Sequence, residues 1–178
     1  MVKRIWSPWR MEYIRGERRG GCIFCDKVKE ERDEENLILL RGQQCFVMLN
    51  RFPYTNGHLM IAPYAHVDMP NKLPLEAQAE MMRLVCICIE VLQEAMHPDG
   101  FNVGMNLGAS AGAGIKDHIH MHVVPRWVGD TNFMPVLGET RVIVEALQES
   151  YRRLEPLFAC RCQTEEGLSP ARKVPSAR

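Results

Sequence analysis

The sequence predicts an α+β domain built around an antiparallel sheet. Apolar segments with strand composition are separated by turn residues, and one long amphipathic helix divides them into two groups. A second helical pattern closes the domain near the end of the chain. The order of strands, long helix, strands and helix is typical of α+β architectures. We expect the domain to occupy residues 22–158, with an N-terminal extension at 1–21 and a disordered tail at 159–178.

Local residue patterns predict the individual elements. Gly42 and Gln43 separate two short apolar runs as a hairpin turn would. The expected strands are Leu37–Arg41, Cys45–Asn50, His58–Ala62, Phe101–Leu107 and His118–Arg126. The expected helices are Pro74–His97 and Arg141–Phe158, and Trp6–Arg19 should be an irregular start followed by a short helix. Apolar residues at three- and four-residue spacing predict that the long helix buries one stripe, which comprises Met82, Val85, Cys86, Ile89 and Met96.

The composition limits the classes of function. The chain has 178 residues, 46% of them hydrophobic, and its 22 basic and 22 acidic side chains balance to zero net charge. A sequence-independent nucleic-acid binder needs excess positive charge, so we expect no nucleic-acid partner. No apolar run reaches the length of a membrane span, and the first residues lack the apolar core of a secretory signal. Seven cysteines, an odd number, favour reduced thiols and a cytoplasmic location.

Three of the six histidines alternate along one expected strand, at His118, His120 and His122. Alternate residues of a strand share a face, so the three side chains should line one side of the sheet. A strand advances roughly 6.6 Å per two residues, so the outer pair lies roughly 13 Å apart, too far for all three to bind one metal ion. We therefore expect different roles. A neutral imidazole is a nucleophile at pH 7, and a second histidine can contact or protonate a phosphate.

A loop of small residues at 108–114 precedes the histidines. Such a loop can present backbone N–H groups to an anion without obstruction by side chains. Its last residues, Gly112, Ala113 and Gly114, are the candidate phosphate contacts.

Cys22 and Cys25 have the spacing of a zinc knuckle. The spacing alone fits a redox or buried cysteine pair equally well. A second knuckle is missing, because Cys160 and Cys162 have the wrong spacing. Histidines would have to complete the site. The candidates are His66 and His118, with His58 and His97 as alternatives.

The segment His118–Val124 resembles the alternating histidine signature of the histidine triad superfamily. The resemblance extends from about Cys22 to Leu154. The segments Leu49–Pro53, Gly57–Ile61 and Asn102–Gly108 resemble strands of that family's nucleotide pocket. Trp6–Met11, Val124–Trp127, Gly129–Asp130 and Asn132–Phe133 are more similar to the branch that acts on diadenosine tetraphosphate than to the shorter phosphoramidases.

The resemblance implies a function and a set of site residues. The resemblance implies that His120 is the nucleophile that carries a nucleotide covalently and that His122 contacts the α-phosphate. It places Asn50 and Asn106 at the ribose or phosphate. It implies a structural zinc ion bound by Cys22, Cys25, His66 and His118, no organic cofactor, and a homodimer.

The sequence departs from the family's pattern just before the triad. Many relatives carry Gln followed by Ser or Thr there, whereas this chain has Gly114 and Ile115, and the loop is one residue longer. Backbone N–H groups must then hold the leaving phosphate. The gap beside Gly114 leaves room for a free phosphate ion held by the loop and Arg126, so we favour phosphate over water as the acceptor.

Other functions remain as alternatives. An adenosine phosphoramidase-like hydrolase would use the same histidines. A zinc hydrolase would need an open metal position, which four protein ligands close. A non-enzymatic nucleotide sensor would not need an intact triad, and a nucleic-acid-binding zinc module is disfavoured by the zero net charge.

Overall fold

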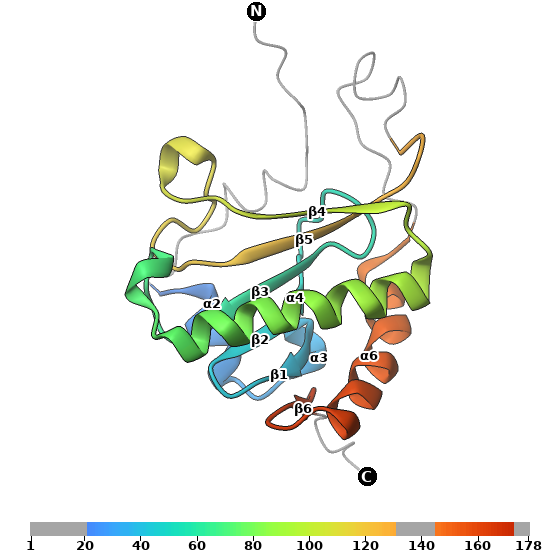
Figure 1. Ribbon diagram of the computed structural model, residues 1–178, viewed down its shortest axis with the longest axis horizontal. Helices are drawn as coiled ribbons and strands as arrows, with labels where there is room; N and C mark the ends of the chain where they lie inside the picture. The colour runs from blue at the N-terminus through green and yellow to red at the C-terminus, as the bar shows by residue number, and fades with distance from the viewer. Residues whose placement is uncertain (1–20, 131–144, 173–178) are drawn as a thin grey trace, which may run out of the picture.

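The structure is a computed structural model that describes residues 21–130 and 145–172. It confirms the expected α+β fold: a six-stranded antiparallel sheet with strand order β4-β5-β3-β2-β1-β6 and helices on both faces (Figure 1). The strands are β1 (Ile38–Arg41), β2 (Cys45–Leu49), β3 (Leu59–Pro63), β4 (Gly100–Met105), β5 (Met121–Arg126) and β6 (Ser169–Pro170). The helices are α2 (Ile23–Lys29), α3 (Asp33–Asn36), α4 (Leu75–Met96) and α6 (Leu147–Thr164), with short 3-10 turns η1 (Pro70–Lys72) and η2 (Ala109–Ala111). The described residues do not include the N-terminal extension with its expected short helix, except for Gly21. They also do not include Asn132–Phe133.

The β1–β2 hairpin forms where the sequence predicts it, and α4 closes its turn. The Glu80 carboxylate of α4 accepts the backbone N–H groups of Gln43 and Gln44 at 2.7 and 2.6 Å. A side chain at Gly42 would overlap that carboxylate, since an ideal Cβ there lies 1.9 Å from its oxygen. The turn residue is therefore small because the helix approaches closely.

Each face of the sheet has its own apolar layer. One layer contains α4 and α6, and its β5 members include Val123, with Met121 packed against it. The other lies on the opposite face, where α2 covers β2 and β3 (Figure 1). Its buried members are Phe24, Ile38, Phe46, Met48, Met60 and Ala62. The candidate site belongs to this second face.

The long helix buries only part of the expected stripe. Met82 is 57% exposed and Cys86 is exposed, whereas Val85 is buried as expected and Ile89 and Met96 are partly buried against the core. The helix residues that pack on the sheet are Ala77, Met81, Leu84, Val85, Ile87, Cys88, Val91 and Leu92. The apolar residues of α4 cover more of the helix circumference than the sheet can contact, so periodicity alone did not select the buried side.

Strand β5 begins later than expected. The expected strand starts at His118, but the ladder with β3 starts at Met121, opposite Ile61. Pro63 ends β3 and has no N–H to donate to residue 119. Instead, the Ile119 N–H donates to Val67 O at 2.6 Å and the His118 ring contacts Pro63 O. The first two triad histidines therefore precede the strand.

The expected disorder from residue 159 onward is wrong for residues 159–172. Helix α6 continues to Thr164, and β6 pairs with β1. Leu168 and Ala171 are buried, so this segment contributes apolar side chains that the composition of the tail concealed. The expected start of the closing helix, residues 141–144, lies outside the described residues.

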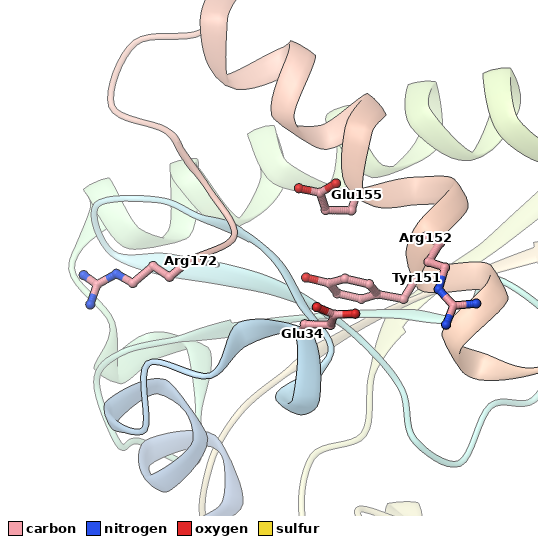
Figure 2. A pocket seen from close by; sticks show the side chains of 5 residues that line it. All are labelled: Glu34, Tyr151, Arg152, Glu155 and Arg172. Carbon is pink, nitrogen blue, oxygen red and sulfur yellow. The ribbon is translucent and has the colours of Figure 1, made fainter. Parts of the chain in front are cut away.

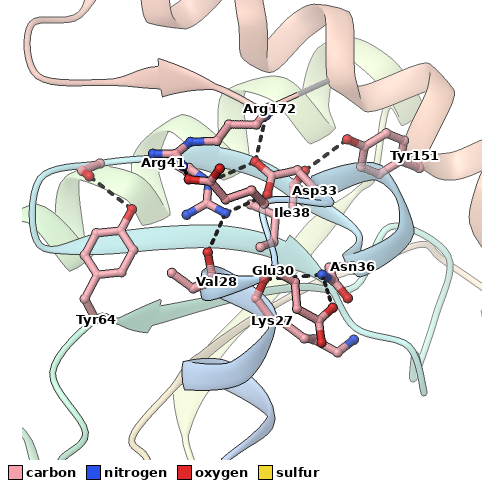
Figure 3. Close-up of polar contacts among 12 residues, drawn as sticks. Lys27, Val28, Glu30, Asp33, Asn36, Ile38, Arg41, Tyr64, Tyr151 and Arg172 are labelled. Carbon is pink, nitrogen blue, oxygen red and sulfur yellow. Dashed lines mark hydrogen bonds and ion pairs between the residues drawn. The ribbon is translucent and has the colours of Figure 1, made fainter. Parts of the chain in front are cut away.

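A buried ion pair joins the C-terminal segment to the sheet (Figure 3). Arg41 of β1 donates to both carboxylate oxygens of Asp33, at 2.9 and 2.6 Å, and both side chains are almost fully buried. The same carboxylate accepts the backbone N–H of Arg172 at 2.7 Å, and Arg41 also donates to Val28 O of α2 at 3.1 Å. This network ties α2, β1 and the end of the chain together.

Candidate functional site

The candidate site lies on the sheet face opposite α4, where β5 and β3 run side by side. His122 is in register with Met60 of β3, and His58 directly precedes that strand. The three triad histidines are between 1% and 9% exposed, and Ile119 and Val123 point into the opposite layer. The predicted alternation of faces is confirmed.

His120 is held in one tautomer. Its Nδ1 lies 2.9 Å from the backbone carbonyl of His118. A carbonyl only accepts, so Nδ1 carries the proton and Nε2 carries the lone pair. The imidazole ring lies between two other rings, with centroids 4.9 Å from Phe24 and 4.9 Å from His122. The side chain therefore has the form that an attacking nitrogen needs.

His58 determines the tautomer of His122. The Tyr54 N–H donates to His58 Nδ1 at 3.0 Å, and the Asn50 amide lies 3.3 Å from the same atom. Nδ1 is therefore an acceptor, and the proton of this fully buried ring is on Nε2. It is donated to His122 Nδ1 at 2.9 Å, so the His122 proton is on Nε2. The Asn106 amide nitrogen lies 3.4 Å from that Nε2, and because both are then donors, the Asn106 amide has to turn its oxygen toward His122 to accept the proton.

The sequence pattern indicated His58 only as an alternative metal ligand and did not predict this relay. Its one local signal was its position directly after Gly57 in a segment similar to the family's pocket strand. Asn50 also lies beside the histidines, 3.3 Å from His58 Nδ1. Its side-chain oxygen accepts the Phe52 N–H at 2.9 Å, which fixes the amide orientation toward His58.

Burial keeps these histidines neutral. It lowers the pKa of His58 from 6.5 to about 3, with smaller contributions from the charges that His122 and His120 would carry. It lowers the pKa of His122 to about 4, with His120 as the second cause. Burial also lowers the pKa of His120, although the bond to the His118 carbonyl raises it. At pH 7 the lone pair on His120 Nε2 is therefore available.

The loop before the triad is more ordered than a free anion cradle. It forms the turn η2, flanked by Gly108 and Gly112 at φ values of 80° and 84°, which favour glycine. The N–H groups of Gly112 and Ala113 donate within the turn, at 3.1 and 3.4 Å. Two of the three candidate phosphate contacts therefore already donate their N–H groups within the loop.

Arg126 is already paired. Its guanidinium donates to both oxygens of Asp130, at 2.5 and 2.8 Å, and to Asn102 Oδ1 at 2.7 Å. The expected role of Arg126 in holding free phosphate would require this pair to open.

Four sulfur and nitrogen atoms gather beside the histidines. His118 Nδ1 lies 3.2 Å from Cys22 Sγ, 3.5 Å from Cys25 Sγ and 3.2 Å from His66 Nδ1. The four ligand atoms all lie within 4.8 Å of one another. Tetrahedral zinc, with bonds of about 2.0–2.3 Å, separates neighbouring ligand atoms by about 3.3–3.8 Å. The Nε2–H of His118 donates to Pro63 O at 2.8 Å, so Nδ1 has its lone pair free for a metal ion. The cluster therefore fits a metal ion, whereas His58 and His97, the alternative ligands, are not part of it.

A separate hollow of about 220 Å³ lies elsewhere, between α3, α6 and the C-terminal segment (Figure 2). Its lining residues are Glu34, Tyr151, Arg152, Glu155 and Arg172. It contains no histidine or cysteine, and its acidic and basic groups balance, so we assign the chemistry to the histidine face.

A sheet that carries alternating histidines at the start of β5, beside a Cys-x-x-Cys pair, defines a histidine triad fold. A family model for the HIT domain matches residues 31–128. The chain is 37% identical over 166 residues to an AP-4-A phosphorylase of Mycobacterium tuberculosis, which covers 89% of this chain and 85% of that protein. The chain belongs to the HIT family.

Other proteins to which this chain is similar include an enzyme with a different named activity and a zinc-bound structure. An adenosine 5'-monophosphoramidase of Schizosaccharomyces pombe is 30% identical over 59% of this chain and 72% of its own length. A zinc-bound histidine triad family protein from Mycobacterium smegmatis superimposes with a TM-score of 0.66 at 27% identity, covering 82% of this chain and 98% of its own. The chain is thus similar to nucleotide-processing enzymes. No helix among the described residues has the length and apolar character to cross a bilayer.

Proposed function

We propose that the protein is a nucleotidyltransferase that acts on dinucleoside polyphosphates through a covalent nucleotidyl-His120 intermediate. The observation that carries this proposal is the hydrogen bond from His120 Nδ1 to the His118 carbonyl, which leaves Nε2 unprotonated with its lone pair available for attack. The relative from Mycobacterium tuberculosis supports the choice of substrate class.

In the first half-reaction His120 Nε2 attacks the α-phosphorus. The bond from that phosphorus to the bridging oxygen breaks, and the polyphosphate remainder leaves with the electron pair. The His122 Nε2–H donates to the phosphoryl oxygens, where negative charge increases in the transition state. Asn50 and Asn106 contact the ribose or phosphate side, and Gly112, Ala113 and Gly114 line the phosphate path. Fixed tautomers mean that neither ring has to reorganise before attack.

In the second half-reaction an acceptor oxygen attacks the phosphorus and the bond to Nε2 breaks. We favour inorganic phosphate as the acceptor. The missing side chain at Gly114 leaves space for it, and the similar phosphorylase of Mycobacterium tuberculosis supports it. Hydrolysis is the second candidate, favoured by the likeness to a phosphoramidase and by the commitment of the Gly112 and Ala113 N–H groups to the turn.

The Cys22, Cys25, His66 and His118 cluster would hold a structural zinc ion. When bound, the metal supplies a cross-link between α2, the segment after β3 and the segment before β5. Four protein ligands leave no open position for water activation, so the zinc hydrolase alternative is disfavoured.

A homodimer in the cytoplasm completes the proposal. Val103 on the edge strand β4 is 42% exposed, and Met82 on α4 is 57% exposed, which gives a second copy apolar surface to cover. All seven cysteines are free, which suits a reducing compartment. Sedimentation velocity of the purified protein would show a dimer, and a monomer at all concentrations would contradict that part.

The products formed from diadenosine tetraphosphate test the choice of acceptor. Phosphorolysis at saturating phosphate yields ADP and ATP, whereas hydrolysis yields AMP and ATP. We expect ADP to be the partner of ATP. If AMP is the only partner under those conditions, the phosphorylase assignment is wrong and hydrolysis is correct. If the protein cleaves an adenosine phosphoramidate but no dinucleoside polyphosphate, it belongs to the phosphoramidase class instead.

A further inference from the structure

Phe24 links the metal-ligand cluster to the candidate nucleophile. It lies between Cys22 and Cys25 in the first turn of α2 and is fully buried. Its ring centroid is 5.0 Å from that of His118, a cluster member, and 4.9 Å from that of His120. One side chain therefore contacts both a cluster imidazole and the attacking imidazole.

The contacts around His120 show what the Phe24 ring contributes. The bond from Nδ1 to the His118 carbonyl fixes one edge of the imidazole but leaves the ring free to swing about that edge. The Phe24 ring, tilted by 45°, and the His122 ring, tilted by 71°, lie against it. With both the Phe24 and His122 rings in place, the His120 imidazole is held in one orientation, so its Nε2 lone pair points in one fixed direction. Without Phe24, the imidazole gains room on one side.

The two ends of α2 are held differently. Its C-terminal end is tied to the protein by Arg41, which donates to Val28 O at 3.1 Å, and by Asn36, which donates to Lys27 O at 3.2 Å. At its N-terminal end Cys22 has no side-chain cap hydrogen bond. Apart from the apolar packing of Phe24 and Cys22, the side-chain contacts described there are those of the two cysteines with His118 and His66, at 3.2–3.5 Å.

We propose that Phe24 is a positioning residue for His120, and that metal loading of the Cys22, Cys25, His66 and His118 cluster holds Phe24 in that position. This inference rests on the proposed function for its catalytic consequence. In the metal-free protein, weak thiol–imidazole contacts replace metal–ligand bonds, so the first turn of α2 loosens and the Phe24 ring withdraws. The metal centre then controls the orientation of the nucleophile as well as the stability of the fold.

The matched variants are Phe24→Leu and Phe46→Leu. Phe46 is a fully buried ring of the same apolar cluster, 6.3 Å from Phe24, and its ring contacts among the described residues are with Phe24 and Tyr64. Both changes remove one aromatic ring from one cluster, but only the first removes a contact with His120. Urea unfolding of both variants confirms that they are folded.

Two readouts do not depend on turnover. The ¹⁵N shifts of the His120 ring report its tautomer, and the rate of carbethoxylation at the His120 peptide, measured by mass spectrometry, reports its accessibility. We expect Phe24→Leu to retain zinc, to mix the two tautomers and to react faster, while Phe46→Leu behaves like the parent protein. Wild-type protein stripped of metal by a chelator should shift in the same direction as Phe24→Leu.

The kinetic readout separates positioning from binding. We expect Phe24→Leu to lower kcat about tenfold or more with a smaller change in KM, because misplacement of a reacting group by about 1 Å can cost about 100-fold. A change in KM alone, with the His120 tautomer and carbethoxylation rate unchanged, overturns the inference and makes Phe24 a pocket wall. Unchanged His120 readouts in the metal-free protein overturn the role of the metal. If the parent protein shows no nucleotidyl transfer, the proposed function fails, but the two turnover-independent readouts still decide the positioning of His120.

Discussion

Replacement of His58 by Phe isolates the proposed relay to His122. The aromatic ring has a similar shape, but it removes the acceptor of the Tyr54 N–H and the Asn50 amide and the donor to His122 Nδ1. Each lost hydrogen bond contributes about 1 kcal/mol net, and a buried polar group left unpaired costs about 1–3 kcal/mol. Better burial of the apolar ring offsets part of this. We expect the free energy of unfolding at pH 7.5 to fall by about 2 kcal/mol.

The catalytic effect of this variant should exceed its effect on stability. Without His58, the proton of His122 is free to move to Nδ1, and Nε2 then presents a lone pair to the negatively charged phosphate. A proton on the wrong nitrogen of His122 should lower the rate by about 10²- to 10⁴-fold, which is the range of a general acid–base contribution. Steady-state kinetics with diadenosine tetraphosphate should show this loss in kcat. His97→Asn is the control, because His97 is an exposed histidine at the end of α4 whose left-handed backbone suits Asn.

The stability of the His58→Phe variant should also depend on pH with a definite sign. The folded-state pKa of His58 is about 3, below its unfolded value of 6.5, so the unfolded chain binds the proton first. This group therefore lowers wild-type stability as pH falls from 6.5 toward 3. The variant lacks that group, so urea unfolding at pH 5 should show a smaller difference from wild type than at pH 7.5. A kcat within threefold of wild type, or a stability gap that widens in acid, would refute the relay.

Two further predictions follow from buried groups. Burial lowers the pKa of His120. The acid limb of the kcat/KM profile should therefore lie below pH 6.5, and kcat/KM should be constant above that pH. An acid limb at or above pH 6.5 would contradict a neutral, buried nucleophile. Asp33→Asn should lower the free energy of unfolding by about 3–5 kcal/mol, because it leaves Arg41 buried without its charge partner. Asp68→Asn, which breaks an exposed pair with Lys72, should leave the free energy of unfolding nearly unchanged, and equal losses in the two variants would show that burial of the Asp33 pair is unimportant.

Some of the site could be predicted from local pattern. Alternation in the triad segment places His120 and His122 on one face, and the knuckle spacing of Cys22 and Cys25 indicates a metal site that needs histidines. These features depend on residues close together in sequence, or on residue types with few other uses. The similarity to the histidine triad family then narrowed the histidine ligands to His66 and His118, and the structure brings those two to the cysteines.

Other features depend on contacts between distant segments and could not be read from local pattern. The role of His58 depends on the β3–β5 register, which sets Met60 opposite His122. The late start of β5 depends on Pro63, which belongs to another strand. The structure of residues 159–172 involves distant segments, since β6 pairs with β1 and the Arg172 N–H donates to Asp33. The buried side of α4 was predicted only in part, because its apolar residues surround more than one face.

The central claim is the covalent bond to His120, and acid-free rapid quench of the reaction with diadenosine tetraphosphate tests it most directly. Peptide mass spectrometry of the quenched protein should find one adenylyl group on the peptide that contains residues 118–126, with fragmentation that places it on His120. The adduct should be absent from His120→Asn, which should also lack turnover. Full turnover by His120→Asn, or turnover by the wild-type protein with no adduct under single-turnover conditions, would contradict the account.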